Sequence, residues 1–340
     1  MSDGLETGPP TKPGKPPAWM RLTTWALALG CFYLVYDKIS GAAARDGIGA
    51  VEYLVRFLSR ANWLAWLAMM IPYSVFFFLV DSFAATSVIN WFNTRIRYRD
   101  ILPVRASTYI LALVNEQVGK GAMALYLYRR NRVPGWEVGS SMLFIAFVEL
   151  YQLLLFSSIG VATHYSLVQA ASTQLPLDAL LPGVFVGAAI YFVFHIAFFS
   201  SRILPDLKLR ERPILLAFRK AKLWHYGALV CIKAPNLLLA VVVYTFALGL
   251  FHVEVAFGTL LAFLPVIFLA AALPLPFHAG ALALWAVLFP EFPEVSAFSL
   301  IMHTFFVVFN AAIGLLFLPR ANRELFGEAA GVSTPGTDPV

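Results

Sequence analysis

Long apolar stretches recur along nearly the whole chain, and they restrict it to folds that are built for a lipid bilayer. A helix needs about 20 apolar residues to cross roughly 30 Å of hydrocarbon, and several stretches approach or exceed that length. Hydrophobic residues make up 60% of the 340 positions and charged residues only 13%, which leaves too little polar surface for a water-soluble fold. We therefore expect an all-α polytopic membrane protein.

The basic residues are confined to some of the loops. Lysine and arginine gather in the segments 93–105, 128–132, 201–213, 219–222 and 319–323. Neither residue occurs in the loops 163–179, 252–255 and 290–295. The positive-inside rule then makes the basic loops cytoplasmic, with both termini inside and the chain in a plasma membrane such as a bacterial inner membrane. This topology and anionic lipid headgroups explain the net charge of +6 without nucleic-acid binding.

Six apolar stretches can alternate between the two membrane faces. They are 22–39, 63–92, 138–162, 180–201, 225–250 and 296–318. Two further apolar segments, 104–128 and 255–289, have the same kind of loop at both ends, so each is expected to enter and leave on one face. A dozen helical residues rise about 18 Å, which places the tip of such a re-entrant hairpin near the bilayer midplane. In the competing interpretation, 257–272 and 279–289 are separate short spans.

The two halves of the chain share one order of elements. Residues 21–162 and residues 180–319 each run through a span, an amphipathic connector, a span, a hairpin and a span, in opposite orientations. The tails are 1–20, which we expect to be disordered, and 320–340, both on the cytoplasmic side. Such an inverted-topology repeat is typical of transporters, which hold substrate near the midplane between two broken helices.

The second hairpin is interrupted by "LPLPFHAG" (273–280). Pro276 removes an amide donor, Gly280 permits unusual dihedral angles, and His278 adds an ionisable ring at the break. Irregular backbone at membrane depth is tolerated only where it is buried in protein or lines a wet cavity. We expect these three residues to line a substrate cavity.

The first hairpin has its polar residues between two apolar arms. Asn115, Glu116, Gln117 and Lys120 lie in "NEQVGKG", which ends at Gly121. Glu116 and Lys120 are four residues apart, so on a helix they can pair on one face. They are expected to line the same cavity, or alternatively to form a structural ion pair at the tip.

Glu149 lies near the middle of a predicted span, with Gln152 following at i+3 on the same face. A carboxylate at the bilayer centre costs at least about 2.5 kcal/mol, so it has to face a partner or a cavity and is a functional candidate. The alternative is a protonated glutamic acid that is hydrogen-bonded between helices.

A second polar patch comprises Lys233 and Asn236. Lys233 either contacts a phosphate or snorkels to the cytoplasmic face, and Asn236 either joins the site or caps carbonyls freed by Pro235. Asp81 is expected to be an interfacial anchor near the inner end of its helix. The solitary His195 and His303 are expected to make interhelical hydrogen bonds. No spacing of His, Cys, Asp or Glu matches a metal or cofactor site.

The segments 113–156 and 264–289 resemble the flippase-like transmembrane region of the lysylphosphatidylglycerol synthase family, including its free-standing members without a synthase domain. The similarity extends over most of the chain, from about residue 60 to 323. Residues matching the family pattern are Asn115, Gly121, Glu149, Pro274, Pro276 and Gly280. Departures from it are Gln117, Ala122, Leu125, Leu282 and Trp285. The resemblance implies lipid translocation or export.

These observations support three hypotheses. In the first, the chain is a lipid transporter: the headgroup of a phospholipid or polyprenyl-linked lipid binds between 115–120, Glu149, Lys233 and 274–280, while the chains stay in the bilayer. In the second, it is a membrane enzyme that transfers a group to or from a lipid carrier. In the third, it is a non-catalytic assembly partner. Self-association is compatible with each of them.

Overall fold

The fold comes from a computed structural model, which describes residues 18–114, 116–172, 176–204, 206–271 and 275–326. Every regular element in these ranges is a helix. The first half contains α1 (Ala18–Arg45), α2 (Ala50–Arg60), α3 (Trp63–Phe92), α4 (Tyr98–Val114), α5 (Glu116–Asn131) and α6 (Gly135–Thr163). The second half contains α7 (Tyr165–Ala171), α8 (Leu177–Phe199), η1 (Lys208–Glu211), η2 (Pro213–Leu215), α9 (Leu216–Lys220), α10 (Leu223–Gly249), α11 (Phe257–Ala271), η3 (Pro276–His278), α12 (Ala279–Leu288) and α13 (Glu294–Phe326).

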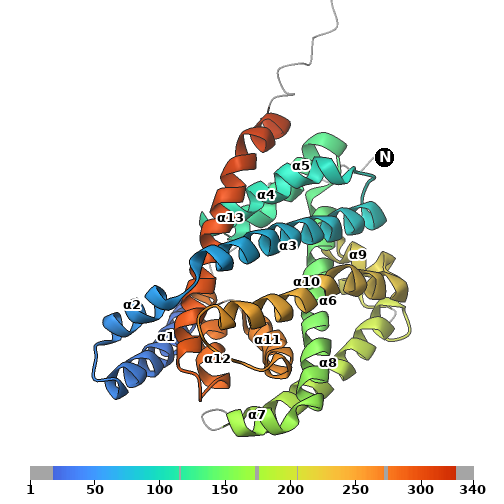
Figure 1. The fold of residues 1–340 in the computed structure, drawn as a ribbon. Coiled ribbons are helices and arrows are strands. Elements are labelled where there is room, and N and C mark those ends of the chain that lie inside the picture. Colours follow the sequence, from blue (N-terminus) through green and yellow to red (C-terminus); the bar gives the residue numbers. More distant parts are fainter. Residues whose placement is uncertain (1–17, 115, 173–175, 205, 272–274, 327–340) are drawn as a thin grey trace, which may run out of the picture.

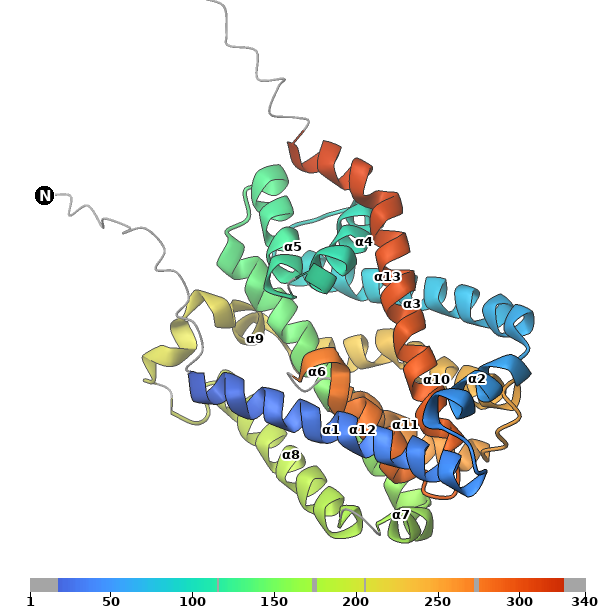
Figure 2. The same ribbon diagram turned by 90° about the vertical axis from the view of Figure 1, so that its left-hand side faces the viewer.

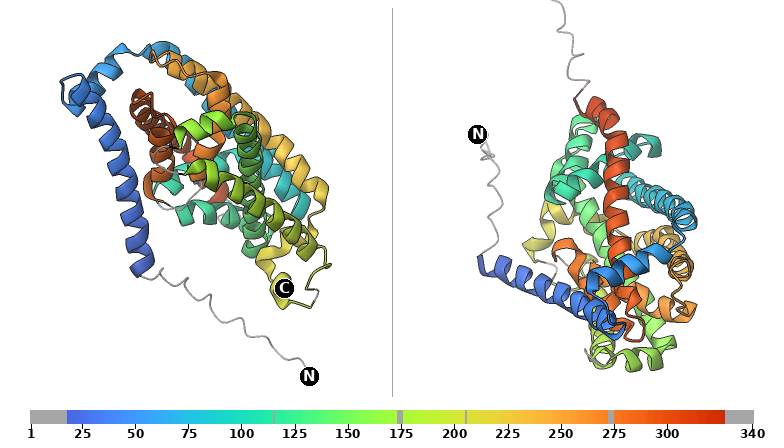
Figure 3. Two further views of the ribbon diagram at one scale, coloured as in Figure 1. Left: turned by 90° about the horizontal axis from the view of Figure 1, so that it is seen from below. Right: turned by 60° about the vertical axis from the view of Figure 1, so that its left-hand side comes forward.

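Among the described residues, five helices are long and apolar enough to cross a membrane, as expected for a multi-pass membrane protein. They are α3, α6, α8, α10 and α13. Helix α1 covers the sixth predicted span, but Asp37 and Lys38 interrupt its apolar stretch, and it is not among the five. Figures 2 and 3 show α1 at the edge of the bundle, where it lies against α12.

The first predicted hairpin comprises α4, described up to Val114, and α5, described from Glu116, and these two helices pack side by side. An ion pair ties its open end, with Arg130 Nη2 3.1 Å from Asp100 Oδ2. The Tyr126 hydroxyl donates a hydrogen bond to the Asp100 carbonyl at 3.2 Å. These contacts lie next to the basic loops, so polar interactions close the end of the hairpin that is opposite its tip.

The second predicted hairpin consists of α11 and α12, joined through η3. His278 has a φ of 52°, in the left-handed region, which turns the chain into α12. A Cβ on Gly280 would lie 3.2 Å from the Ala270 carbonyl oxygen, so the glycine allows α12 to pack tightly against the end of α11. The break is therefore present at the predicted position.

The long helices form two crossed layers. Figure 1 shows α3 and α10 side by side, both crossing α6 and α13 at a steep angle. The hairpins fill the spaces in between, with α4 packed along α13 and α11 packed along α6. A Cβ on Gly314 would lie 2.6 Å from Ile110 Cβ, and one on Gly160 would lie 2.8 Å from Ala262 Cα. Glycine thus permits close approach in both pairings.

The second hairpin is largely enclosed by its neighbours. Nearly all of α12 is buried, and Trp285 stacks on Tyr244 with ring centroids 5.9 Å apart and on Phe289 at 5.3 Å. Leu282 is buried in a cluster with residues of α1. Irregular backbone within a membrane is tolerated where it is buried in protein, and the arms on either side of this break are buried in that way.

Candidate functional site

Four charged side chains from four helices meet inside the bundle. Asp81 comes from α3, Arg105 from α4, Glu149 from α6 and Lys233 from α10. Asp81 and Lys233 are only 6% and 4% exposed. The cluster joins the crossed layers at α3, α6 and α10 and ties the first hairpin to them through α4.

Asp81 accepts hydrogen bonds on both of its carboxylate oxygens. Arg105 donates to Oδ2 from Nε at 2.8 Å and from Nη2 at 2.6 Å. The Tyr109 hydroxyl donates to the same oxygen at 3.0 Å, while Lys233 Nζ donates to Oδ1 at 3.3 Å. The prediction of an interfacial anchor is therefore wrong. Helix α3 runs eleven residues beyond Asp81, about 16 Å, so this carboxylate lies well inside the helix.

Lys233 bridges the two carboxylates. Its Nζ lies 2.9 Å from Glu149 Oε1 and 3.3 Å from Asp81 Oδ1. It does not snorkel, because it lies ten residues into α10 and finds anionic partners inside the bundle. Glu149 has the partner that its position demanded, yet its side chain remains 43% exposed. Glu149 is thus the most exposed side chain of the four.

The charges of the cluster balance, with two carboxylates and two cations. Asp81 and Arg105 form one neutral unit through a charge-assisted pair of hydrogen bonds, and Lys233 and Glu149 form the other. Removing one partner of a buried ion pair costs far more than the intact pair contributes, because a charge is left unpaired. The cluster therefore tolerates exchange of one anion for another better than loss of an anion.

Polar atoms beside the cluster have unused hydrogen-bonding capacity. Asn236, one turn beyond Lys233, donates from Nδ2 to the Phe77 carbonyl of α3 at 3.5 Å, a weak contact across helices rather than a cap on α10. Among the described residues, Asn236 Oδ1 and Ser82 Oγ are buried with no hydrogen-bond partner. Gln152 is buried at 3% exposure. Buried orphan polar groups are rare in native proteins, so these two atoms mark a polar environment next to the charges.

Several predicted site residues do not belong to this cluster. Asn115 lies outside the described residues, and only the helical backbone is described for Glu116, Lys120 and Gly121. Pro276, His278 and Gly280 lie at the turn of the second hairpin, where the His278 ring is 5.5 Å from that of His303. This contact joins the turn to α13, whereas the four charges come from α3, α4, α6 and α10.

The prediction for His195 is confirmed. Its Nε2 lies 3.0 Å from the Tyr226 hydroxyl, which is a hydrogen bond between α8 and α10. The ring also stacks on Phe147 of α6, with centroids 4.2 Å apart. His195 is therefore a packed interhelical residue.

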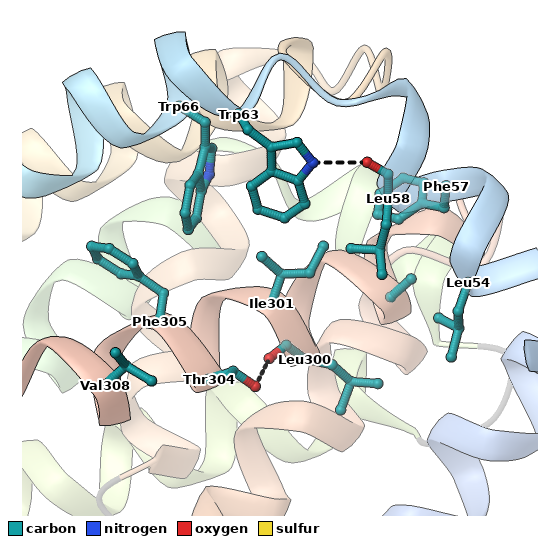
Figure 4. Close-up of a pocket in the computed structure, with 11 residues that line it drawn as sticks. Leu54, Phe57, Leu58, Trp63, Trp66, Leu300, Ile301, Thr304, Phe305 and Val308 are labelled. Carbon is teal, nitrogen blue, oxygen red and sulfur yellow. Dashed lines mark hydrogen bonds between the residues drawn. The ribbon is translucent and has the colours of Figure 1, made fainter.

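Two apolar cavities flank the bundle. One, of about 450 Å³, lies between α2, the start of α3 and α13; Figure 4 shows Trp63, Trp66 and Phe305 pointing toward it. The other, of about 460 Å³, lies between α6, α8 and α10 and includes Val148 and Val230. Val148 adjoins Glu149 in the sequence, and Val230 precedes Lys233 by three residues. Both cavities are of the size that takes a small ligand or part of a lipid chain.

Comparison with known proteins leaves the family resemblance as a prediction. No family profile, curated protein or solved structure matches this chain. Two of the residues that depart from the family pattern, Leu282 and Trp285, are buried in the apolar core, with 3% and 4% of their surface exposed. Any polar site in this protein is therefore built from other residues than those two.

Proposed function

We propose that this chain is an integral membrane transporter that moves a lipid with a polar headgroup between the two leaflets. The observation that carries the proposal is the four-charge cluster at the crossing of the long helices. Glu149 lies fourteen residues from either end of α6, about 21 Å, so the cluster falls near mid-depth of that span. Ionisable groups at that depth are costly and typically mark a pathway for ions or substrate.

The crossed layers support a six-span topology. A helix of 30 residues, such as α3, is about 45 Å long, which exceeds the hydrocarbon thickness and calls for a strong tilt. A membrane normal that bisects the directions of α3 and α13 in Figure 1 tilts both helices in this way. The basic segment after α3 and the end of α13 then lie on one side, at the right and top, with the loop around α7 on the other. On this basis α1 is the sixth span, and both tails are cytoplasmic in a bacterial inner membrane.

The pairing of elements supports an inverted repeat. If the halves are exchanged, α4 takes the place of α11 and α6 that of α13, so the contacts of α4 with α13 and of α11 with α6 are equivalent. The contact between α3 and α10 maps onto itself. Helix α12 has ten residues and rises about 15 Å, half the hydrocarbon thickness, which favours a re-entrant hairpin over two separate spans.

The substrate follows from the two kinds of site. A headgroup binds at the cluster, where Lys233 offers a cationic donor and its partner Glu149 is exposed. The lipid chains remain in the bilayer and in the apolar cavities beside α13 and α8. Phospholipids and polyprenyl-linked lipids both have this combination of a polar head and long apolar chains. Rocking of the two halves about α3 and α10 would expose the cluster to one leaflet and then to the other.

The proposal is tested with purified protein in liposomes that contain a panel of fluorescently labelled phospholipids and a polyprenyl phosphate. The wild-type chain is expected to accelerate movement of at least one lipid between leaflets. Lys233→Met is expected to slow that movement about 10- to 100-fold, because a hydrogen bond to a charged group contributes about 1.5–3 kcal/mol.

Lys208→Met is the matched control, since Lys208 lies in the exposed turn η1. It is expected to leave the rate unchanged. Turnover of a lipid-linked substrate without movement of any lipid would instead support the membrane enzyme. Absence of both, with assembly of a complex lost on mutation of surface loops, would support the assembly partner.

A further inference from the structure

We infer that the Glu149 carboxylate occupies the binding position of a phosphate group, so that the transported lipid is anionic and displaces Glu149 from Lys233 when it binds. This inference rests on the proposed function and specifies its substrate class. It follows from which charged groups of the cluster pair with one another and from how exposed each of them is.

The pairing of the four charged groups, and the distances between them, single out Lys233 as the cation that is available to a ligand. Asp81 is held by both Arg105 nitrogens and by Tyr109, so it and Arg105 already form a neutral unit. Lys233 reaches Asp81 only at 3.3 Å and Glu149 at 2.9 Å. Its closer partner is therefore Glu149.

Exposure determines from which side a ligand can arrive. Lys233 is 4% exposed, whereas the Glu149 side chain is 43% exposed and that of Arg105 is 25% exposed. An approaching group meets the carboxylate first and has to replace it to reach the ammonium group. Once Glu149 has left, Lys233 is buried with an unbalanced positive charge, which favours entry of an anion over a neutral group.

Phosphate suits this position by its chemistry. It is an oxyanion like the carboxylate that it replaces, and it can accept a charge-assisted hydrogen bond from Lys233 in the same way. A zwitterionic headgroup would bring its own cation into a site that already has two. A phosphodiester or diphosphate without an attached cation is the better match, and Glu149 then acts as a tethered competitor that keeps the empty site neutral.

The experiment measures binding in detergent micelles by titrating fluorescently labelled phosphatidylglycerol, with unlabelled lipids and inorganic phosphate as competitors. Removing a tethered competitor raises the fraction of binding-competent protein, so Glu149→Gln is expected to lower the apparent Kd about 3- to 10-fold. Glu149→Asp is expected to stay near wild type, and Lys233→Met is expected to lose the preference for phosphatidylglycerol. Glu254→Gln, at an exposed carboxylate outside the cluster, is expected to change nothing.

The wild-type protein provides a test that does not depend on any variant folding. It is expected to bind phosphatidylglycerol at least about tenfold more tightly than diacylglycerol, which has no phosphate, or than phosphatidylcholine; tenfold corresponds to about 1.4 kcal/mol. Equal affinity for the three lipids would overturn the inference, and so would weaker or unchanged binding by Glu149→Gln. Inorganic phosphate that competes as well as the lipid would overturn the lipid source of the anion.

Binding and movement are separate readouts, so the two proposals can fail separately. Selective binding without movement between leaflets would refute the transporter and leave the phosphate site in place. Movement of zwitterionic lipids alone, unaffected by Glu149→Gln, would refute the phosphate site and leave the transporter in place.

Discussion

Asp81→Asn should strongly lower the free energy of unfolding, although it hardly changes the shape of the side chain. The substitution Asp81→Asn keeps the size of the side chain but removes the negative charge that accepts hydrogen bonds from Arg105, Tyr109 and Lys233. The cluster changes from two anions and two cations to one anion and two cations. Breaking a buried pair in this way costs about 3–5 kcal/mol, which corresponds to a 10²- to 10⁴-fold shift in the unfolding equilibrium.

The assay is reversible unfolding in mixed micelles, followed by tryptophan fluorescence as the denaturing detergent is increased. Asp37→Asn is the matched control, because Asp37 is an exposed carboxylate on α1, and it should change stability by less than about 0.5 kcal/mol. The double variant Asp81→Asn with Lys233→Met restores the balance of charges. It should therefore be less destabilised than the sum of the two single variants.

A loss below about 1 kcal/mol for Asp81→Asn would refute this reasoning. The four contacts of the carboxylate would then contribute no more than ordinary surface polar contacts. Strict additivity in the double variant would show that Asp81 and Lys233 act independently, contrary to the shared cluster.

Two further predictions concern packing between helices. Gly160→Ala should destabilise the fold by about 1–3 kcal/mol, because the new Cβ would lie 2.8 Å from backbone atoms of α11. Gly187→Ala, with open space around the Cβ, should be neutral, and equal stability of the two variants in the same unfolding assay would contradict the close approach. Tyr226→Phe should lower the free energy of unfolding by about 1 kcal/mol, because it removes the hydrogen bond to His195. Tyr191→Phe, at a residue that is 53% exposed, should have no effect. Unchanged stability of Tyr226→Phe would show that the hydrogen bond is not formed.

Hydropathy and loop charge predicted much of the architecture. The apolar stretches gave all of the long helices to within a few residues at most ends, because a bilayer demands long apolar runs with internally satisfied backbone. The interruption of the second hairpin was also predictable, since Pro276 and Gly280 have strong local effects. Helix α1 is the weakest of the six predictions, because charged residues dilute its apolar stretch.

The sequence alone predicted two of the four charged residues of the site. Glu149 and Lys233 stood out because each is an isolated charge inside an apolar run. Asp81 and Arg105 did not, because Arg105 belongs to the basic segment 93–105 and Asp81 was expected to be an interfacial anchor near the inner end of its helix. Which of these charges meet depends on how α6 crosses α3 and α10, and a pattern along one chain does not contain that angle. The signal that could have found them is charge balance: two buried anions require two cations of matching depth.

Passage of lipid headgroups through the charge cluster is tested most directly by the rate at which purified protein moves labelled phosphatidylglycerol between the leaflets of liposomes. The wild-type chain and Lys208→Met are expected to accelerate this movement, and Lys233→Met is expected to be slower by at least about tenfold. A Lys233→Met protein that folds normally and moves lipid at the wild-type rate would show that lipid headgroups do not pass through the charge cluster.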